Sequence, residues 1–291
     1  MSKDNAMNKP LVMGAVAYAP KVVTIWEGFK EYFRRHDFEF DFILYSNYEH
    51  QVEAQFNGTI DIAWNSPLAW VRADRMARAR GQSVRAVAMR DTDCDLTSVL
   101  VVRNDSATGE VSALRGKTVG FGAIDSPQAN LIPLDHLRAQ GLVAGRDYTA
   151  RRFDLLCGKH GDHIGGERDA ALALMAGEID AAWMIDGNHL AFSREGVLPA
   201  GATRIVARTG AYDHCNFTTS PGAPEEAVAR FVELLLGMAW DDPSVRPLLE
   251  LEGLKAWREG RTSGYALLER AVDDERFYDA KGNILVADYR Y

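Results

Sequence analysis

Cysteine and long apolar runs are both scarce in this chain of 291 residues. The three cysteines, Cys94, Cys157 and Cys215, are an odd number at wide spacing, which fits reduced thiols better than a disulfide framework. No run approaches the roughly 18 apolar residues of a membrane-spanning helix, so we expect no membrane insertion. The apolar segment Leu11–Ala19 is too short and wrongly flanked for a signal peptide. We therefore expect a cytoplasmic protein if the printed start is the natural one, and a periplasmic protein if that start is a truncation.

Positive charge and common catalytic motifs are also lacking. The formal net charge is -8, and no basic stripe is present that would displace counterions from a nucleic-acid backbone. The Gly-x-Ser-x-Gly, P-loop and His-Glu-x-x-His patterns do not occur, which removes support for common hydrolase, nucleotide-dependent and zinc-protease chemistry. We therefore expect no nucleic-acid partner, and we assign no catalytic residue.

Short β-forming runs and amphipathic segments alternate along most of the chain. Leu11–Ala17 is an apolar strand pattern, and Val22–Arg35 carries large apolar residues at helical spacing. The same order restarts after the turn-rich stretch 104–109, and the chain is mainly helical from Pro224 onward. This alternation predicts an α/β protein with mostly parallel sheets covered by helices on both faces.

One internal similarity organises this pattern into two parts. Phe56–Trp64 and Met175–Trp183 share the sequence G-x-I-D-x-A-W, and each lies between a predicted helix and a predicted strand. In both places a glycine ends the helix, the isoleucine is expected to pack inward, and the aspartate stays at the turn. The repeat predicts two lobes of like construction.

Four stretches carry a resemblance to a known family. They are Gly58–Trp70 (GTIDIAWNSPLAW), Ser98–Asp105 (SVLVVRND), Leu114–Asp125 (LRGKTVGFGAID) and Ala176–Ala182 (AGEIDAA). In this order and spacing they resemble the PhnD-like branch of type II periplasmic binding proteins, the phosphate, phosphite and phosphonate solute-binding family. The resemblance extends from Leu11 to about Asp274.

The resemblance implies an α/β fold of two lobes, with mixed sheets flanked by helices and a ligand cleft between the lobes. Lobe one would comprise residues 10–101 and 210–291, and lobe two residues 102–209. Val99–Val102 and Ile205–Thr209 would be the hinge strands. The implied function is that of a binding protein that closes over a small polar or charged solute, with an ABC permease as partner only if the chain is exported.

Ligands of open α/β sheets bind beyond the carboxyl ends of the strands, so the loops at those ends contain the candidate contacts. The predicted ligand-binding residues in these loops are Tyr18, Asn47, Tyr48, Asn65, Ser66, Ser98, Asp125, Ser126, Gln128, His160, His163 and Asp186.

The loop Asp125–Asn130 departs from the family's pattern. Family members typically have a Ser-Thr-Ser-like run there, whose hydroxyls and helix amides hold the phosphonate, whereas this chain reads Asp-Ser-Pro-Gln-Ala-Asn. Asp125 either faces the ligand, where it would repel a dianion, or caps the following helix. Both alternatives favour an amine, amide, hydroxylated or mixed-charge ligand over a phosphonate. Asp186 has the same two alternatives, and capping of the helix 187–195 is favoured.

A glycine-rich loop brings Cys157, His160 and His163 together, and His214 and Cys215 are adjacent at the other hinge. Thiols and imidazoles are ligands of zinc and iron, but loop histidines more often form hydrogen bonds, so we assign no metal ligand and no cofactor. The alternative function is a cytosolic enzyme on the same fold, metal-dependent through Cys157, His160 and His163, or using Asp125, Asp186 or His160 as acid or base.

Overall fold

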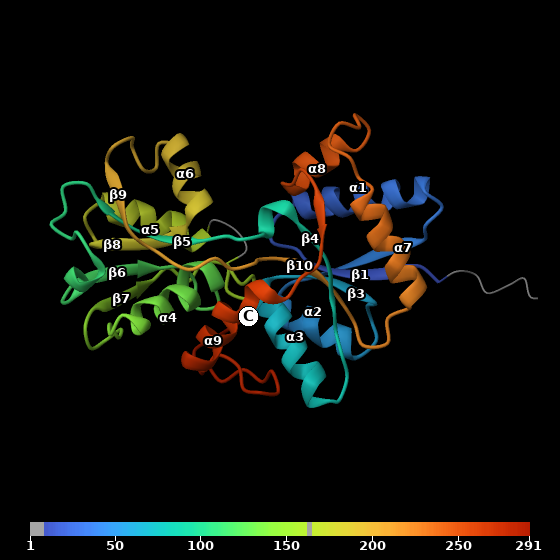
Figure 1. Ribbon diagram of the computed structural model, residues 1–291, viewed down its shortest axis with the longest axis horizontal. Helices are drawn as coiled ribbons and strands as arrows, with labels where there is room; N and C mark the ends of the chain where they lie inside the picture. The colour runs from blue at the N-terminus through green and yellow to red at the C-terminus, as the bar shows by residue number, and fades with distance from the viewer. Residues whose placement is uncertain (1–8, 162–164) are drawn as a thin grey trace, which may run out of the picture. The chain divides into compact units, whose positions relative to one another are not determined.

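Helix α1 (Lys21–Arg35) shows how the apolar spacing becomes a packed core. The computed structural model describes residues 9–161 and 165–291 (Figure 1). The helix buries Val22, Ile25, Trp26, Phe29 and Phe33, which recur every three or four residues and therefore lie on one face. That face packs against strand β1 (Leu11–Val16), whose alternate side chains point to the same side of the sheet.

The chain forms two units. Unit 1 comprises Met1–Cys94 and His214–Thr262, and unit 2 comprises Asp95–Asp213 and Ser263–Tyr291. Each unit contains its own sheet and its own buried apolar clusters.

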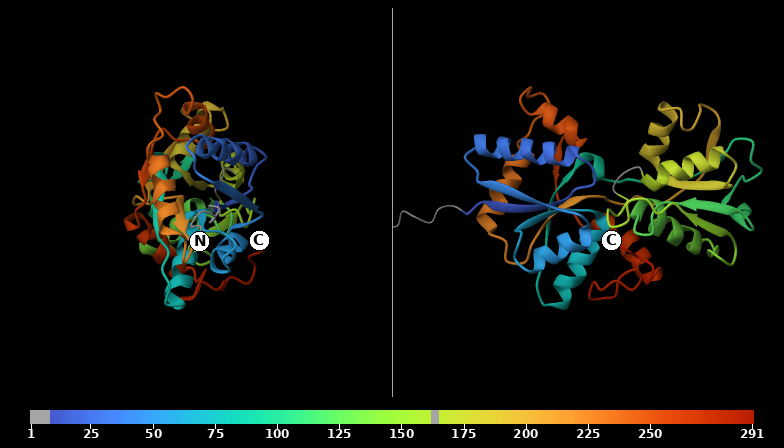
Figure 2. Two further views of the ribbon diagram at one scale, coloured as in Figure 1. Left: turned by 90° about the vertical axis from the view of Figure 1, so that its right-hand side faces the viewer. Right: turned by 180° about the vertical axis from the view of Figure 1, so that it is seen from behind.

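The sheet of unit 1 is mixed. Its strands lie in the order β11 (Trp257–Glu259), β4 (Ala86–Arg90), β10 (Asn216–Thr219), β3 (Ile62–Asn65), β1 and β2 (Phe40–Tyr45). The pairs β1–β2 and β1–β3 are parallel, and the remaining pairs are antiparallel. The sheet is covered by α1, α2 (Tyr48–Phe56), α3 (Pro67–Ala79), α7 (Glu225–Leu236) and α8 (Arg246–Glu252). Figure 2 shows α1 and α8 on one face of this sheet and α2 and α3 on the other.

The sheet of unit 2 is mixed as well. Its strands lie in the order β7 (Thr149–Arg152), β6 (Thr118–Phe121), β8 (Ala181–Ile185), β5 (Ser98–Arg103) and β9 (Thr203–Arg208). β6 is parallel to β7 and β8, whereas β5 is antiparallel to β8 and β9. Its helices are α4 (Ile132–Ala139), α5 (Gly165–Met175), α6 (Asp186–Arg194) and α9 (Ala266–Asp274). In Figures 1 and 2, α5 and α6 cover one face and α4 and α9 the other.

The sheets differ from the mostly parallel ones that the alternation predicted. Strands β4, β5, β9, β10 and β11 run antiparallel to their neighbours. Periodicity along the chain identifies a strand but not its direction in the sheet, and this explains the error. The short strand β11 was not predicted at all.

The end of the chain belongs to unit 2, whereas the sequence interpretation placed residues 210–291 in lobe one. Helix α9 packs on α4, where Arg270 forms an ion pair with the buried Asp135 at 2.6 Å. Arg138 and Glu275 form a second ion pair between the same segments. The proposed hinge strands β5 and β9 pair with each other inside the sheet of unit 2, and the chain passes between the units at 94–95, 213–214 and 262–263.

The predicted repeat is confirmed in atomic detail. Asp61 accepts a hydrogen bond from the backbone N–H of Val12 at 2.9 Å, and Asp180 accepts the equivalent bond from Thr118 at 2.8 Å. In unit 1 this carboxylate joins the turn before β3 to β1, and in unit 2 it joins the turn before β8 to β6. Asp61 and Asp180 also donate their own N–H groups to the carbonyls of the same residues.

The isoleucine of the repeat packs against a glycine of the neighbouring strand in both units. A Cβ added to Gly14 would lie 2.5 Å from Cδ1 of Ile60, and a Cβ added to Gly120 would lie 2.5 Å from Cδ1 of Ile179. These two glycines are therefore required by the close approach of the isoleucine.

We expect Gly120→Ala to lower the free energy of unfolding by about 1 to 3 kcal/mol, because the added methyl group overpacks the site. Ile179→Val removes the atom that the methyl group would strike, so the double variant should be more stable than Gly120→Ala alone. The measurement is urea unfolding. Gly14→Ala with Ile60→Val is the matched comparison, in which rescue should be weaker because the added Cβ there also lies 3.2 Å from side chains of Gln51 and Tyr45. Equal stability of Gly120→Ala and the wild type would contradict this account.

Candidate functional site

The predicted residue Asn47 begins helix α2 in unit 1. Its side-chain oxygen accepts a hydrogen bond from the backbone N–H of His50 at 2.8 Å, which is the usual role of an asparagine at a helix N-cap. Its amide nitrogen lies 3.1 Å from Nδ1 of His50. Tyr48 follows in the first helical turn and is buried. Both side chains thus hold the loop after β2 in place.

Asn65, at the end of β3, is locked in a buried network of amides. Its oxygen accepts from Nε2 of Gln51 at 2.8 Å, and its nitrogen donates to Oε1 of Gln55 at 3.0 Å. Gln51 also donates to the carbonyl of Trp64, and Gln55 donates to that of Thr218. The network joins α2 to strands β3 and β10, so Asn65 has a structural role that its position alone did not reveal.

Ser66 caps helix α3, and Tyr18 lies beside the core of unit 1. The hydroxyl of Ser66 accepts from the N–H of Ala69 at 3.1 Å, and Pro67 occupies the first helical position, where its missing N–H costs nothing. Tyr18 is half-buried, and Lys21 Nζ lies 5.7 Å from the centre of its ring.

In unit 2, Asp125 neither caps a helix nor points to solvent. Its Oδ2 atom accepts hydrogen bonds from the backbone N–H of Gly158 at 2.6 Å and of His160 at 3.2 Å, and from the hydroxyl of Tyr289 at 3.2 Å. The side chain is fully buried. The capping alternative for Asp125 is therefore wrong, because the adjacent serine is the cap.

Ser126 accepts a hydrogen bond from the N–H of Ala129 at 3.1 Å and begins a π-helical turn (Pro127–Leu131) that leads into α4. The loop after β7 lies directly on this serine, since a Cβ added to Gly161 would collide with Ser126. Nε2 of Gln128 donates to the carbonyl of Gly161. The start of this π-helical turn is thus covered by the loop after β7.

Ser98 is bound from two sides. Its hydroxyl donates to the carbonyl of Gln128 at 2.5 Å and lies 2.7 Å from the hydroxyl of Tyr212. Because a serine hydroxyl has one proton, Tyr212 donates to Ser98. Burial raises the pKa of Tyr212, and Ser98 opposes this shift, so the phenol remains a donor. The structure thus brings Ser98, Asp125, Ser126, Gln128 and His160 together in unit 2, through hydrogen bonds of Gln128 to Ser98 and Gly161 and of Asp125 to the backbone of His160.

Asp186 does not cap α6, contrary to the favoured interpretation. Its carboxylate is half-exposed and forms an ion pair with Arg208 of β9 at 2.5 Å. The start of α6 is instead held by Glu167, whose Oε2 accepts from the N–H of Ile185 at 3.0 Å and from Nδ2 of Asn188 at 2.7 Å. Glu167 is buried and was not predicted. The available signal was an acidic residue in the first turn of a helix whose later turns are apolar.

Cys157 and His160 belong to the loop in which the alternative function would bind a metal. His163 lies outside the described residues, so the trio as a whole is not tested. Burial, then the nearby Asp125 and Asp154, raise the pKa of Cys157 from 9.0 to about 11, which disfavours the thiolate that a metal or a nucleophilic mechanism needs. Burial also lowers the pKa of Lys159.

The pKa of Cys157 predicts slow alkylation. At pH 8 its thiolate fraction should be roughly 100-fold smaller than that of an ordinary cysteine, and the rate should still rise as the pH approaches 11. The measurement is the rate of carbamidomethylation by iodoacetamide, followed by mass spectrometry of the peptide containing Cys157. If Cys157 were alkylated at the rate of a cysteine in an unstructured peptide, its pKa could not be raised as described.

No helix among residues 9–161 and 165–291 combines the length and the apolar character needed to cross a membrane. A model of the family described as "ABC transporter, phosphonate, periplasmic substrate-binding protein" matches residues 14–265.

Several solved structures are similar to the chain over most of its length. PhnD1 from Prochlorococcus marinus, in complex with methylphosphonate, has 17% sequence identity and a TM-score of 0.68, covering 92% of this chain and 98% of PhnD1. A binding-protein component of a phosphonate ABC transporter from Pseudomonas aeruginosa has 12% identity and a TM-score of 0.64, covering 97% of this chain and 91% of the transporter component. The periplasmic aliphatic sulphonate-binding protein SsuA from Escherichia coli has 16% identity and a TM-score of 0.60, covering 92% and 93%. These similarities confirm the predicted type II periplasmic-binding-protein fold with two mixed sheets flanked by helices.

Proposed function

Because the chain belongs to the family of periplasmic substrate-binding proteins of phosphonate ABC transporters, we propose that this solute-binding protein takes a solute with a positively charged or hydrogen-bond-donating group. The proposal places it with an ABC permease in the periplasm, as the family description suggests. The alternative of a cytosolic enzyme is favoured by none of the matches.

The observation that carries the proposal is that the buried carboxylate of Asp125 occupies the loop after β6. In this chain a carboxylate already accepts the N–H groups of Gly158 and His160 and the hydroxyl of Tyr289. A second buried carboxylate, Glu167, binds the start of α6. Asp125 follows the end of β6, and the carboxylate of Glu167 lies at the end of β8. Unit 2 therefore has negative charge at the positions where a bound anion would need hydrogen-bond donors.

Among the predicted contacts, we propose that the half-buried Tyr18 of unit 1 touches the solute, and that the buried Asp125 of unit 2 acts on it through its charge. We propose that Gln128 and His160, which also form hydrogen bonds inside unit 2, hold the loop beside Asp125. Asn65, Ser66 and Ser98 form hydrogen bonds within their own units, so we propose that they shape the loops. Asn47 and Tyr48 hold the start of α2 in the same way. His163 stays in the proposal on sequence grounds alone, and Asp186 is the weaker acidic candidate because Arg208 neutralises it.

The test is a calorimetric comparison of matched ligands: methylphosphonate, ethanesulfonate, 2-aminoethylphosphonate and ethanolamine. We expect the two amine-bearing ligands to bind and the two simple anions to bind at least about 10-fold more weakly, since a close like charge costs about 1 kcal/mol or more. Asp125→Asn removes the negative charge but keeps an acceptor oxygen, and it should improve the binding of methylphosphonate.

The control is Asp186→Asn, which removes a half-exposed carboxylate that already forms an ion pair and should change binding little. Tight binding of methylphosphonate to the wild type, with no gain in Asp125→Asn, would sink the proposal.

A further inference from the structure

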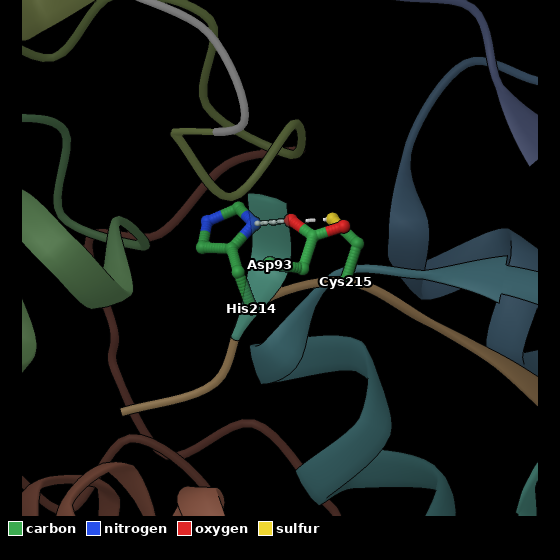
Figure 3. Close-up of side chains that lie close together, drawn as sticks. All are labelled: Asp93, His214 and Cys215. Atoms are coloured by element: carbon green, nitrogen blue, oxygen red, sulfur yellow. Dashed lines mark hydrogen bonds and ion pairs between the residues drawn. The ribbon is translucent and has the colours of Figure 1, made fainter. Parts of the chain in front are cut away.

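A thiol, an imidazole and a carboxylate converge inside unit 1. The side chains of Cys215, His214 and Asp93 turn toward one another (Figure 3), and one ligand atom of each lies within 4.8 Å of those of the others. Nδ1 of His214 lies 3.2 Å from Sγ of Cys215 and 3.5 Å from Oδ1 of Asp93. All three residues are buried. Among the described residues, no other group of three or more histidine, cysteine and acidic side chains lies close enough together to share a metal ion.

The backbone holds these side chains in place. Asp93 ends a short 3-10 turn (Asp91–Asp93) that follows β4, while His214 and Cys215 lead directly into β10. The N–H of His214 donates to the carbonyl of Asp93 at 2.8 Å. The two segments by which the chain leaves and re-enters unit 1 are therefore already joined at this point.

The separations of Nδ1 of His214 from the other two ligand atoms are close to those of a tetrahedral metal site. With bond lengths of about 2.0 to 2.3 Å to nitrogen, oxygen and sulfur, tetrahedral geometry separates the ligand atoms by about 3.3 to 3.6 Å. The two measured separations from Nδ1, 3.2 and 3.5 Å, agree with this range. A thiolate, an imidazole and a carboxylate are also ligands that zinc accepts.

The arrangement does not suit a nucleophilic triad. In such a triad the two nitrogens of the imidazole face different partners, one the nucleophile and the other the carboxylate. Here Nδ1 alone faces both Cys215 and Asp93. Cys215 is also only 2% exposed, which closes it to a substrate but not to a small ion.

The surrounding charges favour a divalent cation. Arg90 binds Asp93 through Nε at 2.5 Å and Nη2 at 2.9 Å, and it also contacts the buried carboxylate of Glu252 at 3.2 Å. Arg90 thus compensates one of two carboxylates, and deprotonation of Cys215 would leave the group with two excess negative charges. Asp93 has enough lone pairs to keep Arg90 while offering Oδ1 to a metal. A divalent ion would make the buried group neutral.

We propose that Asp93, His214 and Cys215 bind a zinc-class divalent metal ion in unit 1, with a fourth coordination position left for water or another small donor. The proposal goes beyond solute binding and does not depend on which solute is bound. The ion links the segment after β4 to the segment before β10 and adds to the stability of unit 1.

The experiment uses the full chain and Zn²⁺ alone. After the protein has been stripped of metal by chelation and dialysis, Zn²⁺ is titrated into it in competition with a chromophoric chelator. The bound metal is then quantified by inductively coupled plasma mass spectrometry. We expect about one tightly bound ion per chain, and a loss of affinity of roughly 100-fold or more in Cys215→Ser and in His214→Ala. Cys157→Ser is the control, because it removes the cysteine of the other loop, and it should retain full affinity.

A spectroscopic readout on the wild-type protein reports thiolate ligation without requiring any variant to fold. Co²⁺ bound to the wild-type protein should give a near-ultraviolet thiolate-to-metal charge-transfer band, which Cys215→Ser abolishes and Cys157→Ser preserves. Absence of zinc binding in the wild type would overturn the proposal. Loss of the ion in Cys157→Ser rather than Cys215→Ser would overturn it as well, because it would place the metal in the other loop.

Discussion

Asp125→Ala is expected to lower the free energy of unfolding of unit 2 by about 3 to 4 kcal/mol, because it removes the charged acceptor that three buried donors share. The donors are the backbone N–H groups of Gly158 and His160 and the hydroxyl of Tyr289. Hydrogen bonds to a charged group contribute more than neutral ones, so the loss should exceed that of an ordinary surface change. The measurement is hydrogen exchange of unit 2 peptides as a function of urea, read by mass spectrometry.

Two further variants separate the parts of this effect. Asp125→Asn keeps one acceptor oxygen and should cost about half as much, and Tyr289→Phe removes a single hydrogen bond and should cost about 1 kcal/mol. If the free energy of unfolding of Asp125→Ala were within about 1 kcal/mol of that of the wild type, the carboxylate would not hold this loop.

The second large effect is expected in unit 1, at Asn65. Asn65→Leu removes one hydrogen-bond partner from each of Gln51 and Gln55, which are almost fully buried and keep their bonds to the carbonyls of Trp64 and Thr218. We expect a loss of about 3 kcal/mol, because buried polar groups that lose a partner pay their full desolvation cost. Urea unfolding followed by hydrogen exchange of peptides from α2 and β3 would measure it.

A double-variant cycle with Gln55→Leu distinguishes lost hydrogen bonds from poor packing. If the amides form one network, Asn65→Leu with Gln55→Leu should cost clearly less than the two single changes together, since the second change removes a group that the first has stranded. Additive losses would instead assign the cost to packing alone.

The sequence was informative where the physics is local. The apolar spacing of α1, the G-x-I-D-x-A-W repeat and the loops at the strand ends could all be recognised from neighbouring residues. Both copies of the repeat form the same hydrogen bond to the strand that pairs in parallel with their own, β1 in unit 1 and β6 in unit 2. The repeat therefore described a real element of structure that each unit needs.

The roles of the site residues could not be predicted, because they depend on partners that are distant in sequence. Asp125 contacts Gly158, which is 33 residues away, and Tyr289, which is 164 residues away. Its neighbour Ser126 took the capping role that either residue type can fill. The direction of β10 in the sheet depends likewise on long-range pairing, with β3 and β4.

The assignment of the last residues to unit 2 has a consequence for how the protein is made. Unit 1 needs strands β10 and β11 from the segment His214–Thr262, and unit 2 needs α9 and Tyr289 from Ser263–Tyr291. A ribosome therefore synthesises all of unit 2's strands before the sheet of unit 1 can be completed, and unit 2 in turn still lacks α9 at that point. Domains that are continuous in sequence can fold one after another during synthesis, whereas unit 1 of this protein cannot be completed before strand β11 has been made, nor unit 2 before Tyr289.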